Sequence, residues 1–126
     1  MISLRTLLWI DCTAGATAGC AVLALAAGGQ FSSLTGLPSW LPIFMGLANL
    51  LYAAFSFSIV VAARYNAMPV RLLVLANAAW SATCLFMAYL FFGTATTLGI
   101  FYLTGESAFV ACLAYLEWKA TLRSAI

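Results

Sequence analysis

Charge is scarce in this chain, and histidine is missing from it altogether. Only 6% of the 126 residues are charged, whereas about a quarter of the residues are charged in a typical soluble domain. So few charges cannot cover a water-exposed surface, which excludes a soluble domain. The lack of histidine removes the usual ligand of b-type haem and the imidazole metal sites. The sequence therefore predicts no metal site and no cofactor.

The four cysteines form no C-x-x-C pair and lie inside apolar stretches. A disulfide-exchanging enzyme needs paired thiols near one face, whereas a buried lone cysteine behaves as a small hydrophobic residue. The sequence also offers no activated nucleophile and no phosphate-binding loop, so we predict no catalytic residue. The net charge of +2 comes without any run of basic residues, and nucleic acid is not an expected partner.

Apolar residues are what the chain has in abundance. They make up 66% of it, with a mean hydropathy of +1.10. A spanning helix needs about 20 apolar residues, and four such runs fill the chain at about residues 4–27, 40–63, 69–92 and 95–117. Helices are expected because lipid leaves no partner for unpaired backbone groups and the runs lack strand alternation. The prediction is one all-α domain over residues 1–126, a polytopic membrane protein of two hairpins.

The basic residues all fall on one side of such a bundle. They precede the first helix, flank the join between the second and third, and follow the fourth: Arg5, Arg64, Arg71, Lys119 and Arg123. Positively charged flanks stay in the cytoplasm during insertion, so both termini are predicted to be cytoplasmic. The opposite connection, at about residues 28–39, is uncharged. Phe31, Leu34 and Leu37 recur there every three positions, which predicts a short interfacial turn of helix.

The two halves of the chain share a spacing. In each half, a basic residue is followed by a polar residue six positions later and by a threonine six positions after that. These are Arg5, Asp11 and Thr17 in the first half and Arg71, Asn77 and Thr83, each 66 positions later, in the second. Since both hairpins start and end on the same side, a repeat would be parallel, with its axis along the membrane normal. The alternative is that any helix entering from the cytoplasm needs a basic flank and tolerates a polar residue two turns in.

Polar residues at membrane depth are the first candidates for function, because they usually face a bundle interior or a cavity. Asp11 lies about 9 Å into the inner half of the first helix, and Asn77 has the same depth in the third. Glu106 lies near the middle of the last helix, and Asn49 is level with it to within a turn. We predict a carboxyl–carboxamide layer at each depth, forming a buried site for a proton or a ligand.

Small residues accompany the first of these acids. Asp11, Gly15 and Gly19 fall at i, i+4 and i+8, so the glycines offer a neighbouring helix a close approach beside the carboxyl group. Such stripes can equally be packing interfaces with no further role. Glu117 stands at the inner boundary next to Trp118, and we expect it to be solvated at the membrane interface.

Three functions fit these features. The favoured prediction is a non-enzymatic binding or assembly role, as an accessory subunit of a membrane complex, with the lipid bilayer and other membrane helices, in a homo-oligomer or a larger complex, as partners. An aromatic-rich third helix could supply the docking face, with Trp80, Phe86, Tyr89, Phe91 and Phe92. The alternatives are a proton-coupled carrier of a small solute and a lipid or quinone binder, both using Glu106 and Asp11.

Two resemblances bear on this choice. The length, the helix count and the acid at position 11 resemble the small multidrug-resistance exporters, which implies Asp11 as a coupling acid. The chain departs from that family in having aspartate there and a complete charge bias. Over its whole length it resembles more closely the uncharacterised small four-helix bacterial integral membrane proteins grouped near the DoxX-like families. That resemblance rests on size and helix count, and it implies a bacterial inner-membrane location without an activity.

Overall fold

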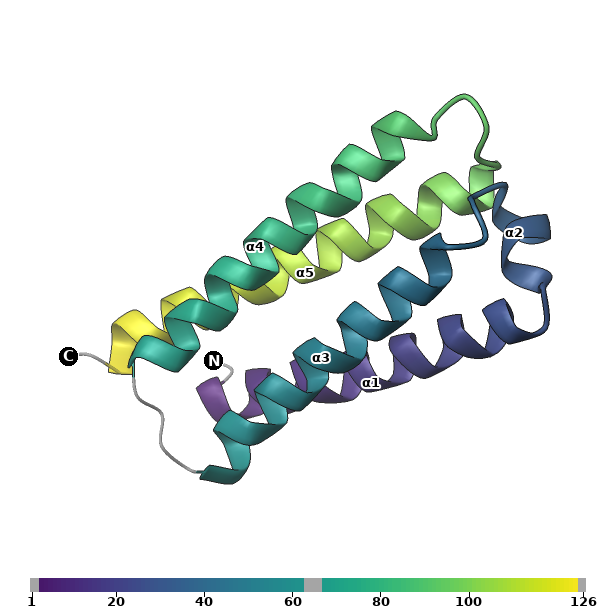
Figure 1. Ribbon diagram of the computed structural model, residues 1–126. Helices are drawn as coiled ribbons and strands as arrows, with labels where there is room; N and C mark the ends of the chain where they lie inside the picture. Colours follow the sequence, from purple (N-terminus) through teal and green to yellow (C-terminus); the bar gives the residue numbers. More distant parts are fainter. Residues whose placement is uncertain (1–2, 63–66, 125–126) are drawn as a thin grey trace.

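The computed structural model describes residues 3–62 and 67–124, and its elements within these ranges are helices (Figure 1). They are α1 (Leu4–Ala27), α2 (Gln30–Thr35), α3 (Leu41–Ala62), α4 (Ala67–Leu90) and α5 (Thr97–Ser124). Four of them, all except α2, are long and apolar enough to cross a membrane. The predicted all-α fold with four membrane-length helices is confirmed.

Helix boundaries lie within about two residues of the prediction except at the end of α5. The sequence predicts an end near residue 117, but α5 continues to Ser124. The predicted end is wrong. It rests on the polar residues near Trp118, which are typical of a membrane interface, but no glycine or proline follows Glu117 to end the helix there. Ala120 and Thr121 are buried, so the packed face of the helix extends one turn beyond Glu117.

The short helix α2 closes the end of the bundle opposite the termini. It ends at Gly36, whose φ of 69° is a conformation that glycine adopts readily. The helical turn predicted here is present, but Phe31 and Leu37 are buried against the bundle instead of facing lipid. The backbone N–H of Thr96 donates to the carbonyl of Thr35 at 2.8 Å, which ties α2 to the start of α5.

In the first hairpin, α1 and α3 pack with their backbones close together. A Cβ atom on Gly15 would lie 2.9 Å from the carbonyl oxygen of Asn49, and one on Gly19 would lie 2.9 Å from that of Gly46. In lipid, the hydrophobic effect does not drive helices together. Van der Waals packing does, and small residues favour it because they let the backbones approach closely. The stripe that the sequence marks beside Asp11 therefore lies against α3.

In the second hairpin, α4 and α5 are joined by a buried pair of serines. The Ser81 hydroxyl donates to the carbonyl of Ser107 at 2.9 Å, and the Ser107 hydroxyl donates to the carbonyl of Ser81 at 2.9 Å. Both hydroxyl groups thus find backbone partners on the neighbouring helix, which keeps them satisfied where water is absent. The two hairpins are held internally by different means, close glycine contacts in one and reciprocal hydrogen bonds in the other.

Contacts between the hairpins are sparser than contacts within them. Across the middle, α1 faces α5 and α3 faces α4. A twofold axis parallel to the helices would produce this arrangement, and so would two hairpins without a repeat; the repeat stays a prediction. Asp11 and Asn77, the positions equated by that repeat, hydrogen-bond to each other, as residues beside such an axis can. The sparse contact leaves room between the hairpins.

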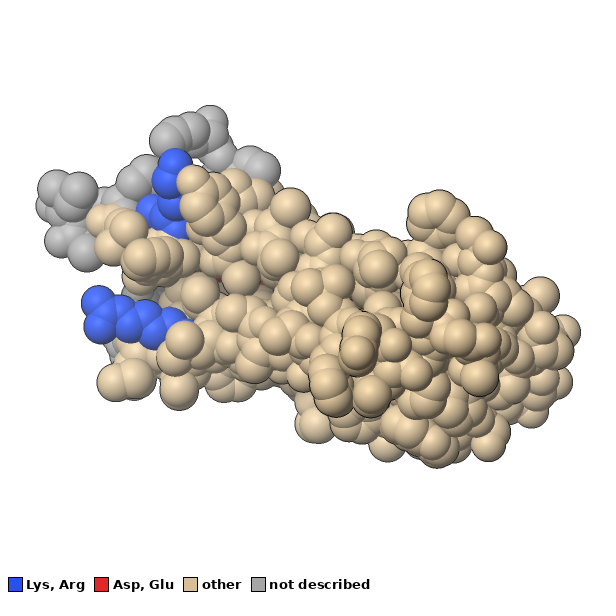
Figure 2. All heavy atoms as spheres, turned by 90° about the horizontal axis from the view of Figure 1, so that it is seen from above, with Lys and Arg blue, Asp and Glu red and all other residues tan. Residues whose placement is uncertain are grey.

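The described basic residues gather at one end of the molecule. Figure 1 places both termini at that end, and Figure 2 shows the lysine and arginine side chains there. Arg5, Arg71 and Lys119 are exposed. Arg64 and the side chain of Arg123 lie outside the described residues. The charge asymmetry expected from the sequence is therefore present for the three cations that can be placed.

The glycine contacts make a matched pair of predictions. Gly15→Ala should lower the free energy of unfolding by about 1–3 kcal/mol, because the new methyl group overpacks the α1–α3 contact. Gly105→Ala should raise it by about 0.5–1 kcal/mol, since a Cβ atom there meets open space and alanine favours the helix. Both are measured by SDS-induced unfolding in mixed micelles. Equal stability of the two variants would contradict the close packing of α1 on α3.

Candidate functional site

A buried polar cluster lies where the four long helices meet. The Asn77 side-chain nitrogen donates to Oδ2 of Asp11 at 3.0 Å and to Oε1 of Glu117 at 3.1 Å. The three side chains are 3%, 5% and 0% exposed, respectively. Ser56 completes the cluster from α3 beside Asp11. Each long helix therefore contributes one polar group, and the amide of Asn77 serves two carboxyl groups at once.

The position of Glu117 corrects the sequence interpretation. We expect from the sequence that it is solvated at the interface, but its side chain is fully buried. The reason is the length of α5, which carries the bundle interior past Glu117, so that this residue shares a face with Glu106 three turns away. The predicted contact between Asp11 and Asn77 is present, and Glu117 joins it as a third member.

A cavity of about 300 Å³ adjoins this cluster between the two hairpins. All four residues that the sequence predicts as a polar site line it, namely Asp11, Asn49, Asn77 and Glu106. The cavity is also lined by aromatic side chains that the sequence analysis did not assign to the site, Tyr52, Trp80, Tyr102 and Phe109. The two predicted layers are thus parts of one site, connected through a shared space.

Near the middle of the bundle, Glu106 is held by an indole and not by Asn49. The Trp80 Nε1–H donates to Oε1 of Glu106 at 3.3 Å. The second carboxyl oxygen of Glu106, the amide nitrogen of Asn49 and the hydroxyl of Tyr102 are buried without hydrogen-bond partners. The hydrogen bond expected between Asn49 and Glu106 is absent from the described residues, although one carboxyl oxygen of Glu106 is left over by Trp80. Both side chains instead face the same cavity with free polar atoms.

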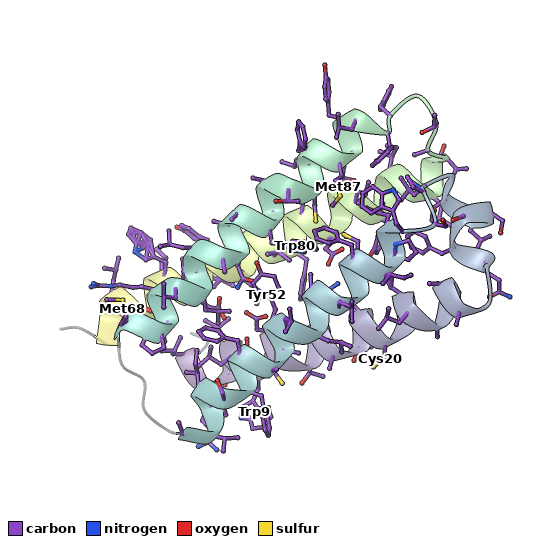
Figure 3. All side chains as sticks on the ribbon, viewed as in Figure 1. Trp9, Cys20, Tyr52, Met68, Trp80 and Met87 are labelled. Atoms are coloured by element: carbon purple, nitrogen blue, oxygen red, sulfur yellow. The ribbon has the colours of Figure 1, made fainter. Side chains whose placement is uncertain are left out.

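Tyr52 and Trp80 form the wall of the cavity on the side of α3 and α4. Their ring centroids are 6.0 Å apart, and Figure 3 shows both side chains between the hairpins. The Tyr52 hydroxyl donates to the carbonyl of Ala76 at 2.8 Å, which fixes the ring across the gap between α3 and α4. On its other side the same pair lines an apolar groove between α3 and α4. The two rings thus separate a polar cavity from an apolar one.

On the side of α1 and α5, the rim of the cavity consists of small residues. Ala14 and Ala18 are half-buried on α1, and Gly105 is exposed on α5. A Cβ atom on Gly105 would have no neighbour within 4 Å, and Phe109 flanks it as an exposed aromatic side chain. These residues lie within helices that are long and apolar enough to cross a membrane.

Among the described residues, those that line the site include no basic side chain. Its lining contains two carboxyl groups, two carboxamides, two phenols and an indole. Such a set offers hydrogen-bond donors and acceptors but no positive charge to hold an anion. Sequence reasoning finds the acids and amides because they stand out in apolar helices. It does not find Tyr102 and Trp80, since aromatic residues are equally common on lipid-facing surfaces; a signal for Trp80 exists only in its position one turn beyond Asn77.

Removal of the shared amide tests the cluster. Asn77→Leu should lower the free energy of unfolding by about 1–3 kcal/mol for each carboxyl group that loses its donor. The matched control is Thr83→Val on the same helix, because the Thr83 hydroxyl donates only to the carbonyl of Ala79 in its own helix at 2.9 Å. SDS-induced unfolding measures both. Indistinguishable stabilities would show that Asn77 does not join the hairpins energetically.

Comparisons with known proteins add no identification. No protein-family model matches the chain, and neither a curated protein nor a solved structure matches it. The two resemblances drawn from size and helix count therefore remain resemblances. The function has to be argued from the cavity, the groups that line it and the side from which it opens.

Proposed function

We propose that this chain is a non-enzymatic membrane protein that binds an uncharged amphipathic molecule taken from the bilayer. The observation that carries the proposal is the set of three buried polar atoms without partners, on Asn49, Tyr102 and Glu106, that line one cavity. Leaving such groups unpaired is unfavourable by about 1–3 kcal/mol each. A bound molecule with matching groups removes that penalty and so gains affinity from the site.

The lining selects the chemistry of the ligand head. The Asn49 amide and the Tyr102 hydroxyl offer donors, while Glu106 offers an acceptor. A head with carbonyl or hydroxyl oxygens satisfies them, as in a quinone, a quinol or a diacylglycerol. An anionic phosphate is disfavoured, because the lining holds two carboxyl groups and no cation. The rings of Tyr52 and Trp80 supply flat apolar walls on which a planar head can stack.

The opening determines how such a molecule arrives. The rim between Ala14, Ala18 and Gly105 faces the hydrocarbon region, so a ligand enters sideways from the bilayer. Its head reaches the polar atoms while its chain stays among lipid chains. The cavity volume of about 300 Å³ suits one ring or one glycerol-sized head and not a complete lipid.

An accessory role in a larger complex is a second candidate. The observation in its favour is the outward aromatic surface of α4 and its following turn, where Phe86, Tyr89 and Phe92 are 60%, 78% and 72% exposed. Two members predicted for that face do not belong to it, because Trp80 is buried at 5% and Phe91 packs against the core. Lipid accepts the remaining surface equally well, so the cavity supports the binding role more strongly. A proton-coupled carrier would use the same Glu106 and Asp11.

Fluorescence of Trp80 tests the binding role. With Trp9, Trp40 and Trp118 replaced by phenylalanine, Trp80 is the remaining tryptophan of the chain. Decylubiquinone should quench it saturably, and dioleoylglycerol should compete if the site accepts both heads. Glu106→Gln should weaken binding about tenfold, the loss expected for one hydrogen bond. Gly105→Leu should abolish it by filling the rim.

The control is Phe86→Leu on the outer face of α4, which should leave the quenching curve unchanged. Quenching that rises linearly and equally in all variants reflects partition of the quinone into the micelle and would sink the proposal. Native mass spectrometry of protein extracted gently from its own membrane then separates the candidates. One retained small molecule supports a binder, whereas a defined complex lost on Tyr89→Ser supports an accessory subunit.

We also propose that the basic end of the bundle is cytoplasmic and that the membrane is a bacterial inner membrane, on the strength of the charge asymmetry. In a variant with all four cysteines replaced by alanine, Ser33→Cys in α2 should react with a membrane-impermeant maleimide in intact spheroplasts of an expressing bacterium. Leu122→Cys, at the opposite end, should react only after permeabilisation. Both positions are exposed. The reverse labelling pattern would invert the proposed orientation.

A further inference from the structure

Two carboxyl groups meet inside the bundle at Asp11 and Glu117. Both side chains accept a hydrogen bond from the same nitrogen atom, that of Asn77, at 3.0 Å and 3.1 Å. Two carboxylate oxygens can bond directly only when a proton lies between them, since neither ionised group has a donor. Two ionised carboxyl groups at this separation would also repel each other strongly in a medium of low dielectric constant.

Among the side chains that the structure describes, no charged group on the surrounding helices neutralises the pair; that of Arg123 on α5 lies outside them. On α1 and α4 the described basic residues, Arg5 and Arg71, are exposed toward the end of the bundle. On α5 the Lys119 ammonium lies over the Tyr115 ring, 5.2 Å from its centroid. Toward the pair, α3 presents the uncharged side chains of Ser56 and Tyr52, and α1 adds the thiol of Cys12 next to Asp11. A bound proton would therefore supply the positive charge that the described side chains do not bring to the two carboxyl groups.

Two fully buried oxygen atoms support the same conclusion independently. Oε2 of Glu117 and the hydroxyl oxygen of Ser56 have no hydrogen-bond partner, and both side chains are 0% exposed. A proton on Glu117 turns its carboxyl group into a donor toward Asp11, and Ser56 can then donate to the same aspartate. A proton on Glu117 would thus give its unpartnered oxygen a hydrogen bond to make.

The surroundings also fix the route by which this proton can leave. One turn nearer the basic end, each helix places a buried residue against the cluster: Leu7 and Leu8 on α1, Ile59 and Val60 on α3, Leu73 on α4 and Ala120 on α5. Among the described residues, the surroundings of the pair on that side are therefore apolar. Toward the midplane, Asp11 and Asn77 line the ligand cavity, which is open.

We propose that Asp11 and Glu117 form a proton-binding pair, held by Asn77, that keeps one proton at neutral pH and exchanges it through the cavity lined by Glu106. The pair deepens the proposed function, because a ligand in the cavity and the proton then share one space, and occupancy of either affects the other. The proton site itself does not depend on the ligand, so it can be tested on the protein alone.

Infrared spectroscopy with ¹³C-labelled amino acids provides the test. The chain contains one aspartate, Asp11, and two glutamates, so labelled aspartate reports on Asp11 alone, and labelled glutamate reports on Glu117 alone in Glu106→Gln. One protonated carboxyl group per pair should persist at slightly alkaline pH, far above the value of about 4.3 at which an exposed glutamate loses its proton. In Asp11→Asn, Glu117 should lose its proton at a lower pH than in the parent chain, because the neighbouring acid is gone.

Two results would overturn the pair: both carboxyl groups ionised at neutral pH, or a titration of Glu117 that Asp11→Asn leaves unchanged. The labelled parent chain needs no substitution at the pair, so a variant that fails to fold does not block the test. Exchange of the carboxyl proton for deuterium should slow in Gly105→Leu, and unchanged exchange would overturn the cavity route. If decylubiquinone does not quench Trp80 but the infrared signal of the protonated carboxyl group is present, the proposed ligand binding is rejected and the proton-binding pair is not.

Discussion

The arrangement of the two hairpins depends on two hydrogen bonds that the side-chain amide of Asn77 donates. Within lipid, a carboxyl group has to find its partners inside the protein, because water cannot reach it. Asp11 on α1 and Glu117 on α5 both meet this requirement through one nitrogen atom on α4. The first hairpin is thereby fixed against the second at one depth. Around this point, buried leucine, isoleucine and valine side chains seal the basic end, and the cavity extends toward the midplane.

The contrast between tight hairpins and a loose junction explains why a cavity exists at all. Glycine contacts bring α1 against α3, and the paired serines bring α4 against α5. Membrane helices that lack such devices have only van der Waals packing and lipid entropy to hold them together. The junction between the hairpins instead uses large rings, with Tyr52 and Trp80 spanning the gap on one side. The opposite side, lined by alanine and glycine, stays open.

Under the proposed function, the ligand and the proton would share one cavity. Glu106 and Asp11 both line the cavity, and Asn77 connects Asp11 to Glu117. A quinol, whose reactions release protons, and a diacylglycerol, which exchanges none, would therefore behave differently in the same site. The aromatic surface around Tyr89 lies on another side of α4 and is free to serve a separate contact.

The sequence by itself determined the membrane class, the four helices, the basic end and the polar positions Asp11, Asn49, Asn77 and Glu106. These follow from local properties, because hydropathy, helix length and the cost of a polar group in lipid are readable residue by residue. Tertiary structure alone decided which polar groups meet. Glu117 belongs to the interior because α5 runs seven residues longer than its polar boundary suggests. Glu106 pairs with Trp80 instead of Asn49, and Tyr102 enters the site, because the rotation of each helix about its axis is set by packing between helices and not by depth along the chain.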